Sequence, residues 1–193
     1  MGQVVVLSDE DLMIRAAQGS RSAFEALVHR WDRAVLRYFQ RFTGSEESSR
    51  DLRQELFFRL YRARGAYNPQ GKFSSWLYRM AHNLAVDLVC RKRSVGSQLE
   101  EQEAAEQVED VNPGARERIW EREIGEILVE AMQRLSAEER TVLILKHDER
   151  ISFEQIAAVL DCPVSTVKSR MYRSFAKLRG HLRSRGVDLS TLL

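Results

Sequence analysis

The sequence predicts an all-α protein made of two small helical domains joined by a flexible acidic linker. Among 193 residues only 10 are glycine and 3 are proline, a composition that suits long helices. Apolar residues recur at helical spacing in successive segments, and most of these segments begin at capping residues. A polar stretch without aromatic residues interrupts this pattern once, as a linker does. We therefore expect domains at 8–94 and 113–185 and a linker at 95–112.

The N-terminal half is predicted to form four helices. Each is preceded by a serine or by a break rich in Ser and Thr. The hydroxyl oxygen of such a residue can accept a hydrogen bond from a free backbone N–H in the first turn of the helix. The expected starts are Ser8, Ser20, Thr43-Gly44-Ser45, and Ser74 or Ser75. The side chains expected to point inward from the third and fourth helices are Leu52, Leu56, Leu60, Tyr61, Leu77, Met80, Ala81, Leu84 and Leu88. A loop with Asn-Pro turn chemistry, 65–71, separates these two helices.

The C-terminal half is predicted to begin with a helix that starts at Asn112-Pro113 and extends to about Leu135. Two capping boxes then mark two further helix starts. They are Ser136 with Glu139, and Ser152 with Gln155. Gly186 is expected to end the last helix.

The stretch from Phe153 to Arg173 predicts a helix-turn-helix, with Asp161-Cys162-Pro163 as the turn. Three apolar residues return at helical spacing after the turn and are expected to pack inward: Val164, Val167 and Met171. The side chains left outside are of types that bond phosphates and base edges in a DNA major groove. They are Ser165, Thr166, Lys168, Ser169, Tyr172 and Arg173. A solvated basic helix face is the simpler alternative, which the tight helix-turn-helix pattern disfavours.

Charge is unevenly distributed, although the formal net charge is only +2. From Asp161 to Arg185 there are seven Lys/Arg against one Asp, and from Lys72 to Arg93 there are five against one. Between Ser94 and Gly114 there are six acidic residues and no Lys or Arg. The two basic stretches favour contact with nucleic acid.

A second candidate surface lies at the start of the fourth helix, where aromatic residues alternate with cations. Aromatic rings stack on unpaired bases while cations follow the backbone, so this pattern suits melted DNA. The residues concerned are Lys72, Phe73, Trp76, Arg79 and Asn83. The alternative is that the aromatic residues here belong partly to the core.

A third candidate surface lies on the third helix. Asp51, Gln54 and Glu55 share one helix face by their spacing, beside Phe58, and such a mixed acidic and amide face can dock a basic partner helix. A solvated charged face is the alternative.

Four motifs, in this order, resemble the extracytoplasmic-function (ECF) group of bacterial RNA polymerase sigma factors of the sigma-70 family. The resemblance extends from about Leu12 to Arg179. The motifs are Asp51-x-x-Gln-Glu-x-Phe57, Phe73-x-x-Trp-Leu-Tyr-Arg-x-Ala81, Leu135-x-x-Glu-x-Arg140, and Ile156-Ala-x-x-Leu-x-Cys-Pro-Val-x-Thr-Val-Lys-Ser-Arg170.

This resemblance implies a region-two domain at 8–94, a region-four domain at 113–185, and promoter-specific initiation with core RNA polymerase. The face with Asp51, Gln54, Glu55 and Phe58 would dock on the β′ clamp helices. The surface around Lys72–Asn83 would recognise and open the −10 element, and the exposed face of the last helix would contact the −35 element. The region-four domain would also bind the β flap. An anti-sigma factor is a further candidate partner.

Other classes of protein are less well supported. A stand-alone helix-turn-helix regulator would use the N-terminal helices for dimerisation or sensing. An enzyme is disfavoured because the four histidines are scattered and no glycine-rich phosphate loop exists. The two cysteines lack ligand-like neighbours, so we expect no metal and no cofactor. No segment resembles a membrane span or signal peptide, so we expect no membrane insertion and a cytoplasmic location.

Overall fold

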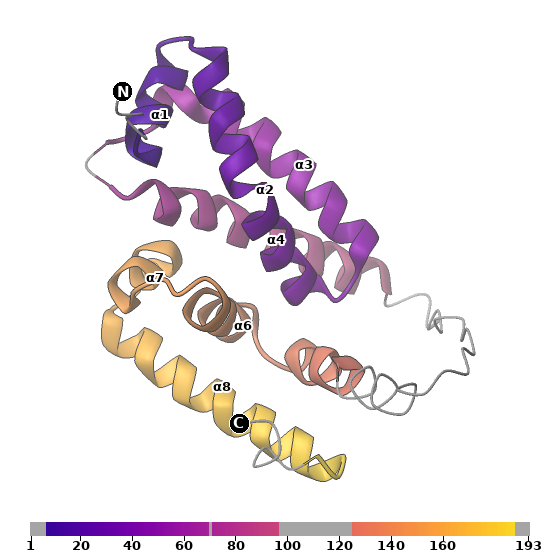
Figure 1. Cartoon of the computed structure of the whole chain (residues 1–193). Coiled ribbons are helices and arrows are strands. Elements are labelled where there is room, and N and C mark those ends of the chain that lie inside the picture. The colour runs from indigo at the N-terminus through magenta and orange to yellow at the C-terminus, as the bar shows by residue number, and fades with distance from the viewer. Residues whose placement is uncertain (1–6, 70, 97–124, 188–193) are drawn as a thin grey trace, which may run out of the picture.

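The computed structural model describes residues 7–69, 71–96 and 125–187, and the regular elements within them are all helical (Figure 1). The predicted all-α class is confirmed. The N-terminal module, 7–96, contains α1 (Asp9–Ala17), α2 (Arg21–Thr43), α3 (Glu46–Ala63), the 3-10 turn η1 (Arg64–Ala66) and α4 (Phe73–Gly96). The C-terminal module, 125–187, contains a helix at 125–133, α6 (Ala137–Leu143), the π-helical η2 (Ile144–Asp148), α7 (Phe153–Leu160) and α8 (Val164–Ser184). The predicted helix start at Asn112-Pro113 and nearly all of the predicted linker lie outside the described residues.

Most helix starts follow from local side-chain caps, as predicted. Ser8, Ser20 and Ser45 each accept a hydrogen bond from the backbone amide three residues later. Both predicted capping boxes are formed, so α6 and α7 begin where their sequences indicate. The hydroxyl oxygen of a serine thus satisfies an amide that the helix itself leaves free.

The start of α4 corrects the prediction of a serine cap. The helix already begins at Phe73, which places Ser74 and Ser75 inside its first turn. The backbone N–H of Phe73 instead donates to the carboxylate of Glu10 in α1, at 3.2 Å. A residue 63 positions earlier in the chain therefore supplies the cap.

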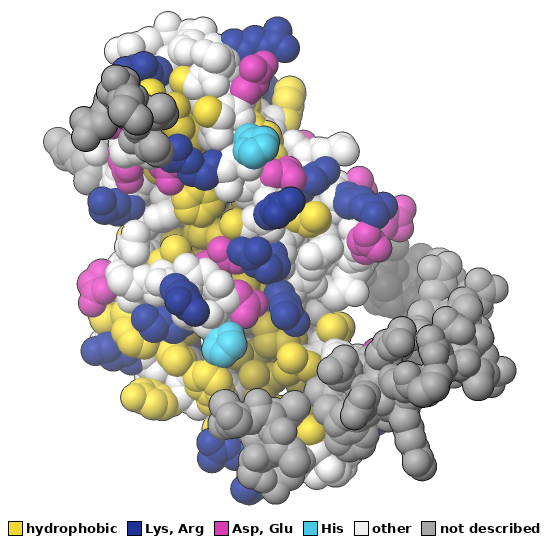
Figure 2. Space-filling model, in the orientation of Figure 1, with side chains coloured by type: hydrophobic (Ala, Val, Ile, Leu, Met, Phe, Trp, Pro, Cys, Tyr) yellow, Lys and Arg dark blue, Asp and Glu magenta, His cyan; other side chains and the backbone are white. Residues whose placement is uncertain are grey.

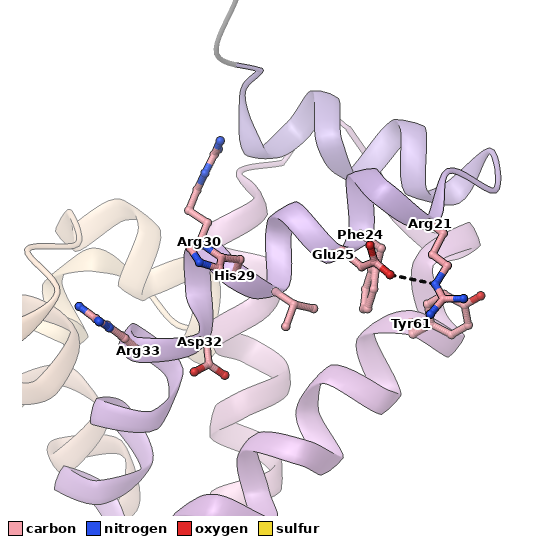
Figure 3. A pocket seen from close by; sticks show the side chains of 9 residues that line it. Arg21, Phe24, Glu25, His29, Arg30, Asp32, Arg33 and Tyr61 are labelled. Carbon is pink, nitrogen blue, oxygen red and sulfur yellow. Dashed lines mark hydrogen bonds and ion pairs between the residues drawn. The ribbon is translucent and has the colours of Figure 1, made fainter.

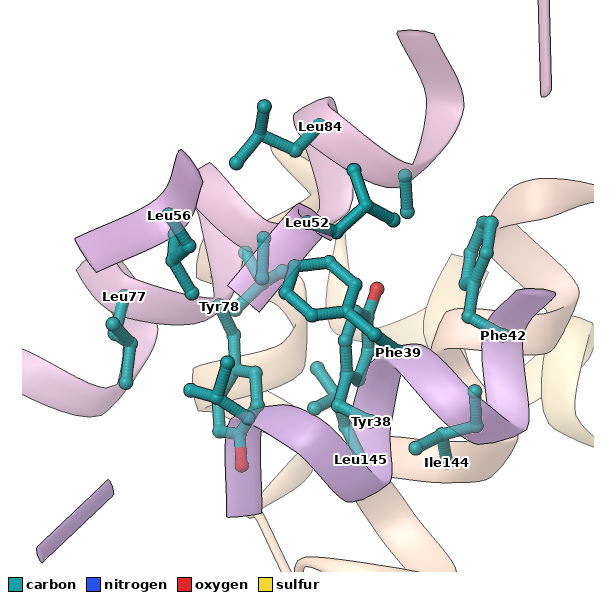
Figure 4. Packing of buried hydrophobic residues seen from close by; sticks show 14 of the residues in the cluster. Tyr38, Phe39, Phe42, Leu52, Leu56, Leu77, Tyr78, Leu84, Ile144 and Leu145 are labelled. Atoms are coloured by element: carbon teal, nitrogen blue, oxygen red, sulfur yellow. The ribbon is translucent and has the colours of Figure 1, made fainter. Parts of the chain in front are cut away.

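The core of the N-terminal module forms where α2, α3 and α4 meet (Figure 4). Leu52, Leu56 and Leu60 of α3 are buried as predicted. Tyr61 is not: its side chain is 43% exposed, because it lies about 100° around the helix from Leu60. Its ring packs edge-on against Phe24 of α2 at a centroid distance of 5.0 Å.

The two modules pack directly against each other. In Figure 1, α4 lies alongside α7. The segment η2 contacts α2. Ile144 and Leu145 of η2 are buried next to Tyr38 and Phe42 of α2 (Figure 4). The buried apolar side chains of both modules therefore form one continuous cluster.

Gly44 lies at a close contact between the two modules. It caps the C-terminus of α2 in the left-handed conformation, with φ of 70°. A Cβ atom at this position would lie 2.9 Å from Cγ1 of Val129 in the C-terminal module. Both the backbone conformation and the packing therefore require glycine here.

Candidate nucleic-acid interface

The outer side of α8 carries the six side chains predicted to contact the −35 element. Thr166 is half-buried. The other five side chains are exposed: Ser165, Lys168, Ser169, Tyr172 and Arg173. Val167 is fully buried on the opposite side, and Asp161 makes the predicted turn before the helix, in the left-handed conformation. The helix-turn-helix therefore presents this set of side chains together on one surface.

Two of the cations on α8 are held in place by local contacts. Nε and Nη2 of Arg173 donate to the carbonyl and the hydroxyl oxygen of Ser169, both at 3.4 Å. The ammonium of Lys168 lies 5.7 Å from the ring centroid of Phe153 in α7. Figure 2 shows that hydrophobic side chains also gather on the visible face of the C-terminal module.

Polar contacts fix α8 on α6. The ammonium of Lys177 bonds both carboxylate oxygens of Glu139 at 2.8 Å. Burial disfavours the charge on Glu139, but Lys177 and the backbone N–H of Ser136 lower its pKa overall. The buried hydroxyl of Ser174 in α8 donates to the carbonyl of Glu139 in α6 at 3.5 Å. The exposed face of α8 is thus supported from behind by contacts with α6.

The surface predicted to hold melted DNA is only partly exposed. Lys72, Arg79 and Asn83 are exposed and Trp76 is half-buried. The prediction that Phe73 belongs to this surface is corrected, because its side chain is fully buried. The centroid of its ring lies 5.8 Å from that of Trp31. Its ring belongs to the core and has no face free to stack on a base.

Tyr67 is a candidate site residue that sequence reasoning missed. Its ring lies 5.2 Å from Trp76, and its hydroxyl donates to the carbonyl of Gly71 at 3.1 Å. It therefore shapes the predicted −10 loop from within. An aromatic residue directly before the Asn68-Pro69 turn was the signal that could have indicated it.

A groove of about 420 Å³ lies between this loop and the C-terminal module. Lys72, Trp76 and Arg79 line it from the N-terminal module, and Glu154, Gln155 and Ala158 of α7 line it from the other side. The guanidinium of Arg79 donates to the carbonyl of Ala158 at 3.2 and 2.6 Å. It also lies 3.8 Å from the carboxylate of Asp161.

The residues predicted to dock on the polymerase line a second groove, of about 710 Å³, between α3 and α4. Asp51 and Gln54 are exposed, Glu55 is half-buried, and Phe58 is 56% exposed. Arg59 pairs with Glu55 at 2.6 Å. An exposed aromatic ring beside acidic and amide groups gives this face both an apolar and a polar part.

Buried polar groups join the two modules. The hydroxyl of Thr141 in α6 lies 2.9 Å from the hydroxyl of Tyr38 and 2.8 Å from Nδ1 of His82. Burial raises the pKa of the Tyr38 hydroxyl and lowers the pKa of the His82 imidazole, so both groups stay neutral near pH 7. Sequence reasoning did not predict this cluster.

Arg140 forms a second connection between the modules. Its guanidinium is buried and donates to backbone carbonyls on both sides, including that of Phe42 at the end of α2. The central carbon of this guanidinium, Cζ, lies 4.9 Å from the centroid of the Phe42 ring. The other carbonyls that accept from it are those of Met132, Gln133 and Leu135.

A further groove, of about 1070 Å³, lies on the outer side of α2 and contains none of the predicted site residues (Figure 3). Its Arg21 and Glu25 pair with each other at 2.9 Å. In the described parts of the chain, no cluster of His, Cys, Asp or Glu could hold a metal ion. Across those same residues, no helix is long and apolar enough to cross a bilayer.

Comparison with known proteins decides between the alternatives. Residues 27–95 match Sigma-70 region 2, and residues 125–178 match Sigma-70, region 4. The RNA polymerase sigma-H factor of Pseudomonas aeruginosa is 33% identical over 173 residues, which cover 86% of this chain and 89% of that protein. The chain belongs to the ECF group of the sigma-70 family.

Further relatives of this sigma factor agree. The ECF RNA polymerase sigma-E factor of Escherichia coli K12 is 32% identical over 176 residues, covering 87% of this chain and 91% of that one. The solved structure of CnrH in complex with the cytosolic domain of CnrY superposes with a TM-score of 0.68 at 25% identity, covering 91% of this chain and 97% of that chain.

As an alternative sigma factor, the protein binds core RNA polymerase and promoter DNA and directs transcription initiation. Its region-2 match lies within the N-terminal module, and its region-4 match lies within the C-terminal module. The face of α8 and the groove between α3 and α4 consequently belong to different sigma regions.

Proposed function

We propose that this sigma factor recognises its promoters with two separate surfaces held by one polymerase. The region-two domain, 8–94, recognises and opens the −10 element, and the region-four domain, 113–185, contacts the −35 element. Residues 95–112 link them. The single observation that carries this proposal is the α8 face, where cationic and hydroxyl side chains lie outward while Val167 and Ser174 are fully buried. This division suits recognition of duplex DNA.

At the −35 element, Lys168, Ser169, Tyr172 and Arg173 contact the DNA, with Ser165 and Thr166 near the helix start. The backbone amides of the first turn of α8 assist, because a helix N-terminus attracts phosphate. Each side chain is exposed or half-buried, so all six can reach a ligand without rearrangement of the helix.

At the −10 element, Lys72, Trp76, Arg79 and Asn83 contact the melted strand. Trp76 supplies a half-exposed ring for stacking, and the exposed cations follow the backbone. Phe73 supports this surface from the core.

Core polymerase is held by two contacts. Asp51, Gln54, Glu55 and Phe58 dock on the β′ clamp helices, and the region-four domain binds the β flap. Two weak DNA-binding modules on one polymerase act at high effective concentration, which fits the modest net charge of +2. The protein acts by binding, with no catalytic site of its own, in the cytoplasm. An anti-sigma factor is a further partner of the protein.

The polymerase contact can be tested by mixing the full chain with purified core polymerase. We expect a stable complex that Asp51→Arg and Glu55→Arg weaken, because both reverse charge on the docking face. Glu47→Arg, an exposed change on the same helix outside the groove, is the matched control. Equal binding of all four proteins would contradict the assigned docking face. Dimeric binding to duplex DNA at two half-sites without polymerase would favour the stand-alone regulator.

A further inference from the structure

We propose that the groove on the outer side of α2 binds an acidic, amphipathic segment of an accessory protein while the sigma factor is bound to core polymerase. This groove, of about 1070 Å³, is lined by residues of α2 between Arg21 and Arg33 and by Tyr61 of α3 (Figure 3). None of the residues proposed to contact core polymerase or promoter DNA lines it. The inference therefore goes beyond the proposed function and adds a further binding surface.

The first support is the apolar floor at one end of the groove. Phe24 and Tyr61 pack edge-on with their ring centroids 5.0 Å apart, and Val28 lies one helical turn beyond Phe24. Tyr61 is exposed although it is aromatic. A partner that covered these side chains would remove apolar area from water. Tyrosine and arginine, which both line this groove, are also among the residue types that dominate binding energy at protein interfaces.

The second support is the excess of positive charge along the groove. Each carboxylate that lines it faces an arginine. The carboxylate of Glu25 lies 2.9 Å from Nε of Arg21. The carboxylate of Asp32 lies 3.2 Å from Nη1 of Arg53. Arg33 is exposed and forms no ion pair with any residue that the structure describes. It can therefore pair with a carboxylate from outside without losing a partner.

The two parts of the groove set the spacing of the partner's side chains. Figure 3 shows Phe24 and Tyr61 together at one end of the groove and Arg33 toward the other. Phe24 and Arg33 are nine residues apart on α2, which is roughly 14 Å at 1.5 Å per residue. A helical segment lying along α2 would cover this span with apolar and acidic side chains about two to three turns apart.

A polypeptide fits this groove better than a nucleic acid does. The carboxylates of Glu25 and Asp32 line the groove and would repel phosphate groups. Cζ of Arg64 lies 4.0 Å from the centroid of the Tyr61 ring, and Phe24 packs against the same ring edge-on. Little of this ring is left for a base to stack on. A polypeptide can place acidic side chains beside Arg33 and neutral ones beside Glu25.

The position of the groove allows core polymerase to bind at the same time. The proposed polymerase-docking groove is lined by residues of α3 and α4, and the two grooves share no lining residue. A partner on α2 would therefore leave the docking face with Asp51 and Glu55 accessible. Such a partner differs from an inhibitor that competes with polymerase.

The test measures binding of a synthetic peptide by fluorescence anisotropy. The probe is a fluorescein-labelled helical peptide of about 14 residues, with two leucines one turn apart and three glutamates about two to three turns farther along. One control peptide carries lysine in place of each glutamate, and the other carries serine in place of each leucine. Binding is measured to the full chain alone and to its complex with core polymerase.

We expect saturable binding of the probe to both forms and little binding of either control peptide. Arg33→Glu should weaken binding roughly fivefold or more, because it replaces an attraction with a repulsion. Tyr61→Ser should weaken it about tenfold, because it removes part of the apolar floor. Arg179→Glu, the same charge change at an exposed site of α8, should bind like wild type.

A second readout separates loss of the groove from loss of folding. Arg33 is exposed and has no partner among the described residues, so Arg33→Glu should keep the wild-type free energy of unfolding. It should also support run-off transcription at the wild-type level when no peptide is present. This variant decides the test by itself if Tyr61→Ser fails to fold.

Four results would overturn the proposal. One is the absence of saturable probe binding up to about 1 mM peptide. The second is equal binding of the probe by wild type and by Arg33→Glu. The third is loss of probe binding when core polymerase is present, which would assign the groove to a competitor of polymerase. The fourth is displacement of the probe by a random-sequence single-stranded RNA, which would assign the groove to nucleic acid.

Discussion

At the scale of single residues, Arg173 is the side chain whose role in the −35 contact is most open to test. Changing Arg173 to alanine removes one cation from the exposed face of α8 and leaves the buried side of the helix intact. Loss of one good base contact costs about 1–3 kcal/mol, so −35-dependent transcription should fall roughly 5- to 150-fold. Arg179→Ala, an exposed change farther along α8, should have little effect. An equal loss on promoters with scrambled −35 sequences would indicate a phosphate contact or misfolding instead.

Phe73 and Trp76 are neighbouring aromatic residues with different predicted roles. Phe73 is fully buried, so Phe73→Ala should lower the free energy of unfolding by about 3–5 kcal/mol. Trp76 is half-buried, so Trp76→Ala should weaken binding of single-stranded −10 DNA by about 1–3 kcal/mol with a smaller loss of stability. Urea unfolding and DNA binding by the polymerase complex measure the two effects. If the Phe73→Ala protein is fully folded and still loses more DNA binding than Trp76→Ala does, this assignment is wrong.

His82 should make the stability of the chain depend on pH. Burial lowers its pKa in the folded chain below the ordinary value of 6.5, so the unfolded chain binds a proton that the folded chain does not. The free energy of unfolding should therefore fall as pH decreases below about 6.5. Urea unfolding at pH 7.5 and 5.5 measures this loss, which should be smaller in His82→Gln and unchanged in His29→Gln, an exposed histidine. Equal losses in all three proteins would assign the effect to other groups.

At the scale of helices and their connections, Arg140 supports several elements at once. Its guanidinium donates to the end of α2 and to the last residues of the helix at 125–133. Arg140→Met keeps much of the volume but leaves several buried carbonyls without a donor, at about 1–3 kcal/mol each. We expect the free energy of unfolding to fall by at least about 3 kcal/mol. Arg134→Met, an exposed change in the same segment, should alter it by less than about 0.5 kcal/mol.

The sequence predicts helices well where the determinants are local. Ser136 with Glu139 and Ser152 with Gln155 form capping boxes whose partners lie three residues apart, and both are present. The start of α4 depends on Glu10, and its first-turn serines turn instead to α7. No local pattern carries such long-range information. Tyr61 shows a related error, because periodicity predicted that it points inward, whereas it is exposed in the structure.

At the scale of the whole molecule, the candidate surfaces could be located from sequence but their arrangement could not. Side chains on α8 and α3 form common surfaces because helical spacing alone places them together. The packing of the modules depends on Tyr38, His82 and Thr141, whose partners lie 59 and 103 residues apart along the chain. Helical periodicity indicates that such residues face inward, and it does not indicate which element they face.

The arrangement of the whole molecule also bears on the two DNA-binding surfaces that we propose. The α8 face and the α4 surface lie in different modules, and Arg79 of the α4 surface donates to the carbonyl of Ala158 in α7. Affinity for a promoter then depends on polymerase to hold both modules at once. A sigma factor built in this way should bind DNA weakly alone and strongly as part of the polymerase complex.

The measurement that tests this account most directly is run-off transcription by purified core polymerase with the full chain. The template is a promoter selected from host genomic fragments, used intact, with the −35 element scrambled, or with the −10 element scrambled. We predict a transcript that requires the chain and the intact promoter, with a large loss when either element is scrambled. A transcript that forms equally on all three templates, or no chain-dependent transcript from any genomic fragment, would contradict the account.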